Sequence, residues 1–405
     1  MNQHVIFAAP FLLPTTARFI SAATRVPGVA LTLVSQDPAE RLPSELRSRV
    51  AGHWRVDDAL DPQQLVDAAR ALSRRFGPAT RYMGALEQLQ VPLALAREAL
   101  GLPGLSVDAA RNFRDKARMK TVLRAADVPC ARHVLAASVG AVQQFVQTVG
   151  FPLIAKPPAG AGGKGTFRLE DGTQLRAFVE QHVPQPSRPV LLEEFVRGEE
   201  YSFDSVCIAG RMVWHSVSRY LPSPLEVMEN PWIQWCVLLP RELDGFGAIQ
   251  DAAARGLRAL GLQTGLSHME WFRLRGDRIA VSEVGARPPG AQITSLLSYA
   301  HDLDFYRAWS RLMIRDEFEP PARTHAVGAA YFRGQGRGKV ARIVGLDEAQ
   351  RRFGALVVES NLPYEGQTPS DSYEGDGFVI LRHRETAVVE DALKQLVSLV
   401  RVELS

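Results

Sequence analysis

Residues 268–287 read HMEWFRLRGDRIAVSEVGAR, which places Glu270 and Glu283 at equal distances from a Gly-Asp pair. If Gly276-Asp277 is a two-residue hairpin loop, alternation along both strands brings Glu270 opposite Glu283 on one face. Opposed carboxylates destabilise a hairpin unless a cation balances their charge. The expected neighbours on that face are all apolar: Phe272, Leu274, Ile279 and Val281. The hairpin therefore predicts a partly dry site whose hard oxygen ligands favour Mg²⁺ or Mn²⁺ over zinc.

An arginine follows the second strand of this hairpin, in Arg287-Pro-Pro-Gly290. A glutamate pair alone is also compatible with two solvated side chains that bind nothing. Arg287 favours a functional site, because a fixed guanidinium beside the metal can grip a phosphate or a carboxylate with two hydrogen bonds.

A glycine-rich segment, PPAGAGGKGT at residues 157–166, lies between an expected strand ending at Lys156 and its return strand. Successive glycines allow backbone N–H groups to converge on an anion, so the segment predicts a cradle for phosphates. It fails the Walker pattern, since Gly165 stands where Ser or Thr should follow Gly163-Lys164. Strand-like residues also replace the helix that a Rossmann site needs. A flexible surface turn remains the alternative for the loop taken alone.

A second connector, residues 191–204, runs from one expected strand through a glycine turn into another. Its backbone groups could recognise an adenine edge, with Glu200 accepting hydrogen bonds from ribose hydroxyls. Taken alone, it is equally compatible with a plain acidic loop.

Composition narrows the class of protein. The chain has 405 residues, a formal net charge of +3 and dispersed arginines, which fits two or three globular domains and argues against a nucleic-acid partner. The three cysteines are far apart and read as reduced, packed thiols. The apolar N-terminal run lacks a basic flank and contains two prolines, and no stretch is long enough to span a membrane. A cytoplasmic protein is expected.

The pattern of elements changes along the chain. Short apolar runs alternate with helical periodicity over the first hundred residues, with helices expected near 16–26, 62–74 and 84–100, which indicates a parallel βαβ layer. From about residue 110 the sequence predicts a basic helix at 115–126, a further helix and then antiparallel strands. A polar loop at 359–377 and an amphipathic helix at 387–400 are expected near the C-terminus.

Taken in order, these segments resemble the ATP-grasp superfamily over nearly the whole chain. The resemblance implies α/β and α+β architecture with three parts: a Rossmann-like pre-ATP-grasp domain at 1–109, an ATP-grasp domain at 110–313, and a C-terminal α+β lobe at 314–405. The ATP-grasp domain would divide into a nucleotide-binding small lobe at about 120–196 and a metal-binding lobe at about 197–313.

The resemblance also assigns roles to residues. Glu270 and Glu283 would carry Mg²⁺, and Arg287 would orient the reacting carboxylate. The residues expected to bind ATP are Lys116, Lys156, Gly162, Gly163, Lys164, Gly165, Glu193, Glu194, Phe195, Val196 and Glu200. Lys164 is also a catalytic candidate, and Arg219 and Tyr220 are weaker candidates for substrate binding. One departure stands out: Gly285 fills the place of an Asn that often ligates metal in this family, which leaves the second Mg²⁺ in doubt.

Within the superfamily, residues 101–104 and 125–132, together with Arg114-Asp-Lys116, look like the carboxylate-amine ligases that join amino acids. We therefore predict an ATP-dependent ligase that forms an amide or peptide bond from small carboxylate and amine substrates through an acylphosphate. A homodimer would be compatible with the resemblance. A biotin-carboxylase-like or formate-using enzyme, and a protein that binds ATP without catalysis, are the alternatives.

Overall fold

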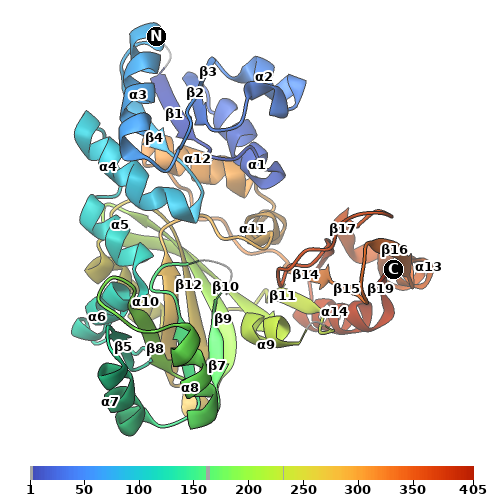
Figure 1. The fold of residues 1–405 in the computed structure, drawn as a ribbon. Coiled ribbons are helices and arrows are strands. Elements are labelled where there is room, and N and C mark those ends of the chain that lie inside the picture. Colours follow the sequence, from blue (N-terminus) through green and yellow to red (C-terminus); the bar gives the residue numbers. More distant parts are fainter. Residues whose placement is uncertain (1–2, 161–164, 231) are drawn as a thin grey trace.

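The computed structural model describes residues 3–160, 165–230 and 232–405, which form four β-sheets flanked by helices (Figure 1). The N-terminal sheet has the order β3-β2-β1-β4, and all of its pairs are parallel. Its strands are β1 (Gln3–Ala8), β2 (Val29–Ser35), β3 (Gly52–Arg55) and β4 (Ala79–Met83). The helices of this layer are α1 (Pro14–Thr24), α2 (Ser44–Arg49), α3 (Pro62–Phe76) and α4 (Gln90–Leu100), with the 3₁₀ turn η1 (Ala39–Arg41). The predicted parallel layer is confirmed.

The helix expected over residues 84–100 is shorter than predicted, because α4 begins only at Gln90. Gly84 lies so close to β1 that a Cβ atom on it would be 2.9 Å from the carbonyl oxygen of Ala8. The chain then forms a 3₁₀ turn, η2 (Glu87–Leu89), before the helix starts. This turn carries the carboxylate of Glu87 into the interior, where the residue is only 8% exposed.

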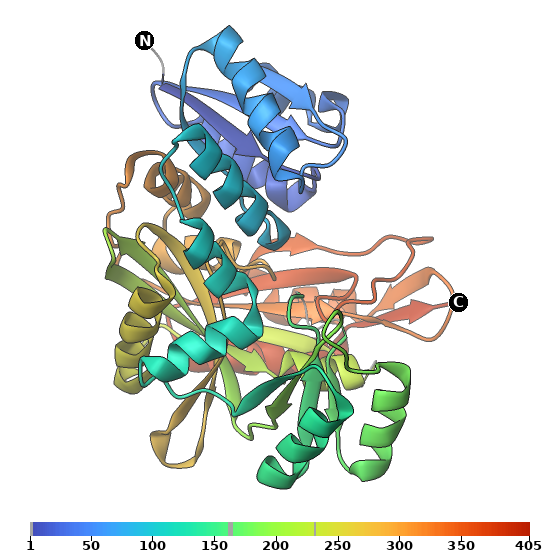
Figure 2. The same cartoon turned by 60° about the vertical axis from the view of Figure 1, so that its left-hand side comes forward.

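Two helices, α5 (Val107–Arg114) and α6 (Lys116–Ala125), link the N-terminal layer to the rest of the molecule (Figure 2). Asp115 caps α6, since its carboxylate accepts hydrogen bonds from the backbone N–H groups of Ala117 at 2.9 Å and Arg118 at 3.0 Å. The predicted basic helix is confirmed. Lys116 and Lys120 are one turn apart on it, and both are buried.

The small lobe contains an antiparallel sheet in the order β5-β8-β6-β7. Its strands are β5 (His133–Ala136), β6 (Leu153–Lys156), β7 (Phe167–Leu169) and β8 (Val190–Glu194). Its helices are α7 (Val139–Val149) and α8 (Gly172–Gln181), which pack on the sheet through a cluster that includes Phe145 and Phe178.

The largest sheet is antiparallel, with eight strands in the order β13-β12-β9-β10-β11-β14-β18-β17. Its strands are β9 (Glu199–Ile208), β10 (Arg211–Leu221), β11 (Trp235–Leu239), β12 (Gly265–Arg273), β13 (Ile279–Gly285), β14 (Ala326–Phe332), β17 (Val357–Asn361) and β18 (Gly377–His383). The associated helices are α9 (Pro224–Glu229), α10 (Gly247–Leu260), α11 (Ile293–His301), α12 (Phe305–Arg315), α13 (Leu346–Phe353) and α14 (Thr386–Leu399), with the 3₁₀ turn η4 (Gly354–Leu356). A small third sheet joins β15 (Gly334–Gln335), β19 (Arg401–Leu404) and β16 (Val340–Val344).

The large sheet passes through the division that we propose between residues 313 and 314. Strand β14, which follows that division, pairs with β11, which precedes it, over five residue pairs from Trp235–Tyr331 to Leu239–Val327. The last two parts of the proposed division therefore share one hydrogen-bonded sheet. The division of the chain into three parts stays a proposal.

The two hairpin glutamates pair as predicted, but the turn that joins their strands differs from the prediction. Glu270 does pair with Glu283, but the loop is a 3₁₀ turn, η3 (Arg275–Asp277), rather than a two-residue turn. Arg273 therefore pairs with Ile279, and a β-bulge next to Glu270 restores the register. The bulge also shifts Ile279 to the face that packs with Trp271, so its predicted place beside the glutamates is wrong, whereas Val281 packs in the same cluster and also lines the cleft. Phe272 does line the glutamate face.

Among the described residues, no helix is long and apolar enough to cross a membrane. Cys207 and Cys236 are buried, Cys130 is half-buried, and all three are free thiols, as predicted.

Candidate functional site

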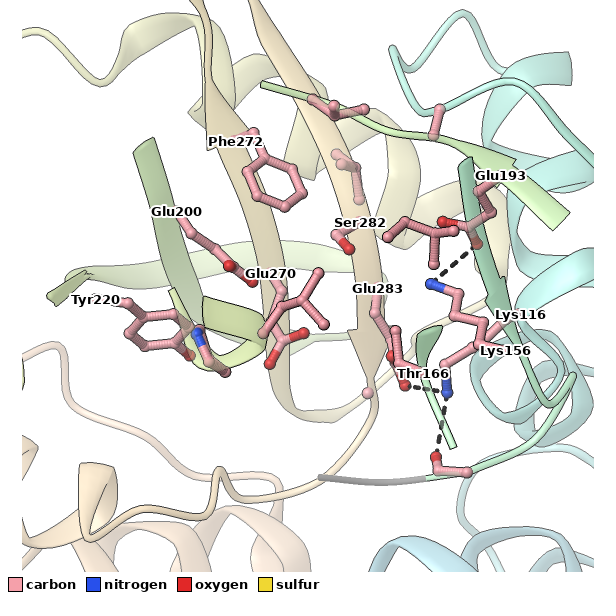
Figure 3. Close-up of a pocket in the computed structure, with 18 of the residues that line it drawn as sticks. Lys116, Lys156, Thr166, Glu193, Glu200, Tyr220, Glu270, Phe272, Ser282 and Glu283 are labelled. Atoms are coloured by element: carbon pink, nitrogen blue, oxygen red, sulfur yellow. Dashed lines mark hydrogen bonds and ion pairs between the residues drawn. The ribbon is translucent and has the colours of Figure 1, made fainter. Parts of the chain in front are cut away.

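A deep cleft lies between the small lobe and the large sheet, and it encloses about 1510 Å³ including its open mouth. Most of the predicted site residues line the cleft (Figure 3). Its charged walls include Glu87, Lys116, Lys120, Lys156, Glu193, Glu200, Glu270, Glu283 and Arg287.

The two hairpin glutamates face the cleft and each has a cationic neighbour. The ammonium of Lys116 lies 2.8 Å from Glu283, and Nε2 of His268 lies 3.7 Å from Glu270. His268 also bonds through Nδ1 to buried Asp204 at 2.7 Å. Burial alone would lower the pKa of His268, but Asp204 and Glu270 together raise it to about 9. The protein's own cations thus balance both carboxylates.

The carboxylates of Glu270 and Glu283 fit a divalent cation of the Mg²⁺ type. Among the described residues, no group of three or more His, Cys, Asp or Glu side chains is arranged to hold a metal ion. Two carboxylates are sufficient for Mg²⁺, because its other ligands are commonly phosphate oxygens and water.

A second charged cluster joins Lys156, Glu193 and Lys120. Lys156 lies 2.9 Å from Glu193 and Lys120 lies 3.4 Å from it, while Lys120 also donates to the carbonyl oxygen of Ser282 at 2.8 Å. Burial would raise the pKa of Glu193, but the two lysines outweigh it and lower the pKa. The sequence analysis missed Lys120, although its spacing of four residues from Lys116 placed both on one helical face.

Replacing Lys120 with alanine is expected to destabilise the protein by about 3 kcal/mol, because a fully buried ion pair would lose one partner. Urea denaturation would measure the loss. Arg118→Ala is the matched control on the same helix; its exposed side chain should contribute less than about 0.5 kcal/mol. Equal stability of the two variants would contradict the structural role of Lys120.

The described part of the glycine loop contributes to the cleft. The carbonyl oxygen of Gly160 accepts hydrogen bonds from Lys116 at 3.1 Å and Arg114 at 2.9 Å. Gly165 has a φ of +74°, which favours glycine, and Thr166 lines the cleft. Gly162, Gly163 and Lys164, predicted to bind phosphates, lie outside the described residues.

The end of β8 also lines the cleft through Glu193 and Glu194, and the connector after it does so through Phe195 and Val196. The carboxylate of Glu194 bonds to the backbone N–H of Arg132 at 2.8 Å and to its guanidinium at 2.6 Å. The Glu194 carboxylate is thus engaged by Arg132, and its contribution to the cleft comes from the rest of the residue.

Glu200 lies beside Glu270 in the cleft, on the neighbouring strand β9 (Figure 3). Burial and the charge of Glu270 raise the pKa of Glu200 to about 8, although Lys156 acts in the opposite direction. This placement brings three glutamates to one wall, where the hairpin alone predicted two.

Arg287 is held by a residue that the sequence analysis did not identify. Its Nε donates to Oε2 of Glu87 from the N-terminal layer, and its Nη1 donates to the carbonyl oxygen of Pro288 at 2.8 Å. Burial would lower the pKa of Arg287, but Glu87 outweighs it and raises the pKa. A Cβ atom on Gly285 would lie 3.3 Å from Oε2 of Glu87. Because residue 285 is a glycine and not the asparagine that is common in the family, there is room for the Glu87 carboxylate.

Arg219 is not among the residues that line the cleft, and its assignment to the substrate pocket stays a prediction. Its guanidinium pairs with Glu199 at 2.9 Å and with Glu390 at 3.6 Å. Because side chains alternate along β10, the next residue, Tyr220, lines the cleft instead. The hydroxyl of Tyr220 lies 3.3 Å from Nε2 of His268.

The chain is similar to known proteins in both sequence and fold. Residues 121–296 match the model of the ATP-grasp domain. The L-arginine-specific L-amino acid ligase of Bacillus subtilis is 21% identical over 364 residues, covering 88% of this chain and 87% of that protein. The uncharacterized protein y4rH of Sinorhizobium fredii is 28% identical over 221 residues, covering 53% of this chain and 45% of y4rH. The chain therefore spans less than half of y4rH and most of the arginine-specific ligase.

The crystal structure of an L-amino acid ligase from Bacillus licheniformis superimposes with a TM-score of 0.80 at 20% identity, covering 100% of this chain and 99% of that one. This likeness confirms the predicted mixed α/β fold. ATP-grasp enzymes use ATP with Mg²⁺, in line with the nucleotide and metal predicted from the sequence. Residues 121–296 of the chain thus match an ATP-grasp domain.

Proposed function

We propose that the protein is an ATP- and Mg²⁺-dependent ligase that joins the carboxylate of one amino-acid-like substrate to the amine of another. The observation that supports this most is the convergence of Glu270, Glu283, Lys116, Lys156 and Arg287 on one cleft. A carboxylate pair, buried lysines and a fixed guanidinium are the groups that phosphoryl transfer to a carboxylate requires.

ATP would lie across the cleft, with its phosphates between the small lobe and the hairpin. Lys116 and Lys156 would contact the phosphates, and the glycine loop with Lys164 would close over them. Backbone groups near Phe195 and Val196 would face adenine, while Glu200 would reach a ribose hydroxyl. Glu193 would act chiefly by holding Lys156 and Lys120 in place.

In the reaction, an oxygen of the substrate carboxylate attacks the γ-phosphorus of ATP, which gives an acylphosphate and ADP. The amine of the second substrate then attacks the acyl carbon, inorganic phosphate leaves, and the nitrogen loses a proton. Arg287 would hold the reacting carboxylate and stabilise the developing oxyanion. Mg²⁺ bound at Glu270 and Glu283 would neutralise charge that spreads over the transferred phosphoryl group.

Mg²⁺-dependent release of ADP and phosphate, measured with L-amino acids singly and in pairs, tests this function. We expect release with particular pairs, together with a product one water lighter than their sum by mass spectrometry. Firm ATP binding without release for any pair would contradict the ligase and favour bicarbonate, another carboxylate or a nucleotide-binding role.

A further inference from the structure

One end of the cleft is apolar, in contrast to the charged walls around the hairpin. The residues of this end, here called the apolar wall, are Tyr220, Leu225, Met228, Trp235, Ile293 and Tyr373. They come from β10, α9, β11, α11 and the long loop before β18. The wall is next to the proposed reacting groups, because Tyr373 lies close enough to Glu270 and Arg287 for their charges to act on its phenol.

Trp235 is the centre of the apolar wall and offers no hydrogen bond to a ligand. Its ring centroid lies 5.4 Å from that of Tyr220 and 4.7 Å from that of Tyr373. Its indole N–H already donates to the carbonyl oxygen of Pro222 at 3.0 Å. The indole N–H is therefore not available to a ligand, and the residue, only 1% exposed, is largely covered by its aromatic neighbours.

Helix α9 contributes its apolar side to the wall and keeps its charges outside. Leu225 and Met228, three residues apart, line the cleft. Glu226 is exposed, and Glu229 pairs with Arg168 at 3.5 Å. The helix is anchored by fully buried Val227, whose carbonyl oxygen accepts a hydrogen bond from Arg333 at 2.6 Å. The orientation of α9 is thus fixed by buried contacts.

We infer that the amino acid whose carboxylate lies at Arg287 has an uncharged, apolar side chain, and that the apolar wall receives it. This inference rests on the proposed ligase function. A leucine, methionine or phenylalanine side chain would bury its surface against Leu225, Met228 and Tyr373. A charged side chain would lose hydration against Leu225 and Met228, which offer it no partner of opposite charge.

Hydroxylamine can replace the amine substrate, so that specificity for the carboxylate substrate is measured separately from specificity for the amine. It attacks the acylphosphate, forms the acyl hydroxamate and releases phosphate, so hydroxamate and ADP report the first half-reaction. For the wild-type protein, we expect kcat/KM for Leu, Met or Phe to exceed that for Asp, Glu, Lys and Arg by about tenfold or more. A preference for a charged amino acid would overturn the inference and leave the ligase function standing.

Met228→Glu tests the wall itself. We expect it to lower kcat/KM for apolar amino acids about tenfold and to raise the relative use of Lys and Arg. Glu226→Gln is the matched control on the exposed side of the same helix, and its substrate ratios should equal those of the wild type. Leu225→Ala removes apolar surface without adding charge, and it should reduce kcat/KM most for the largest side chain.

The outcomes separate the two proposals. Unchanged substrate ratios in Met228→Glu and Leu225→Ala, with normal ATP binding by calorimetry, would overturn the apolar wall as the specificity site. Absence of ADP release from the wild type with every amino acid would instead overturn the ligase function, and the inference with it.

Discussion

Replacing Glu283 with glutamine is expected to reduce Mg²⁺-dependent ADP release by roughly 10²–10³-fold or more, because the proposed metal site would lose one of its two carboxylates. The substitution preserves the size of the side chain, and Gln can still accept a hydrogen bond from Lys116. We therefore expect the fold to survive while the charge that holds the metal is lost. Steady-state turnover across a range of Mg²⁺ concentrations would measure the effect.

Glu45→Gln provides the control for this experiment, since its carboxylate is exposed and lies on the short helix α2 of the N-terminal layer. Its turnover should match that of the wild type. Calorimetric titration with ATP in the absence of turnover would show whether the Glu283 variant still binds nucleotide. Undiminished ADP release by that variant would contradict a metal-binding role for Glu283.

Replacing Glu87 with alanine is expected to cost about 3 kcal/mol of stability, because it leaves the largely buried guanidinium of Arg287 without its carboxylate partner. Turnover should also fall roughly 100-fold, because Arg287 would no longer be held in the position from which it orients the reacting carboxylate. Urea denaturation and steady-state ADP release would measure the two effects. Glu98→Ala, on the exposed side of α4, is the matched control.

A double-mutant cycle distinguishes positioning from a general loss of stability. If Glu87 acts through Arg287, then Glu87→Gln should lower turnover strongly in the wild-type background and only slightly in an Arg287→Lys background. Glu87→Asp, which keeps the charge, should recover part of the activity. Losses that simply add across the cycle would show that Glu87 does not act through Arg287.

Local sequence patterns predicted much of this fold. The parallel N-terminal layer and the basic helix were predicted from the sequence pattern, and the glutamate pairing was correct even though its loop was not. The bulge beside Glu270 could not be foreseen, because Ile279, Ala280 and Val281 are all apolar and fit either face of the strand. The longer turn shifts the pairing of the two strands by one residue, and the bulge shifts it back by one. Glu270 and Glu283 therefore still pair.

The parts of the site that escaped prediction depend on contacts between distant segments. Glu87 and Arg287 are 200 residues apart, and nothing near either residue in the sequence indicates the other. Lys120 has a helical spacing that could have been used, but its burial depends on Glu193 and Ser282 from two different sheets. Arg219 was assigned from its place at a strand end, and alternation along β10 put Tyr220 in the cleft instead.

The continuous ladder from β13 to β17 has a consequence for how such a protein can change through evolution. If residues 314–405 were exchanged or removed as a module, β11 would become an exposed edge whose backbone groups could pair with other chains. The same exchange would take away the loop that brings Tyr373 to the cleft. We therefore expect residues 314–405 to change together with the cleft residues that they contact, rather than as an independent unit.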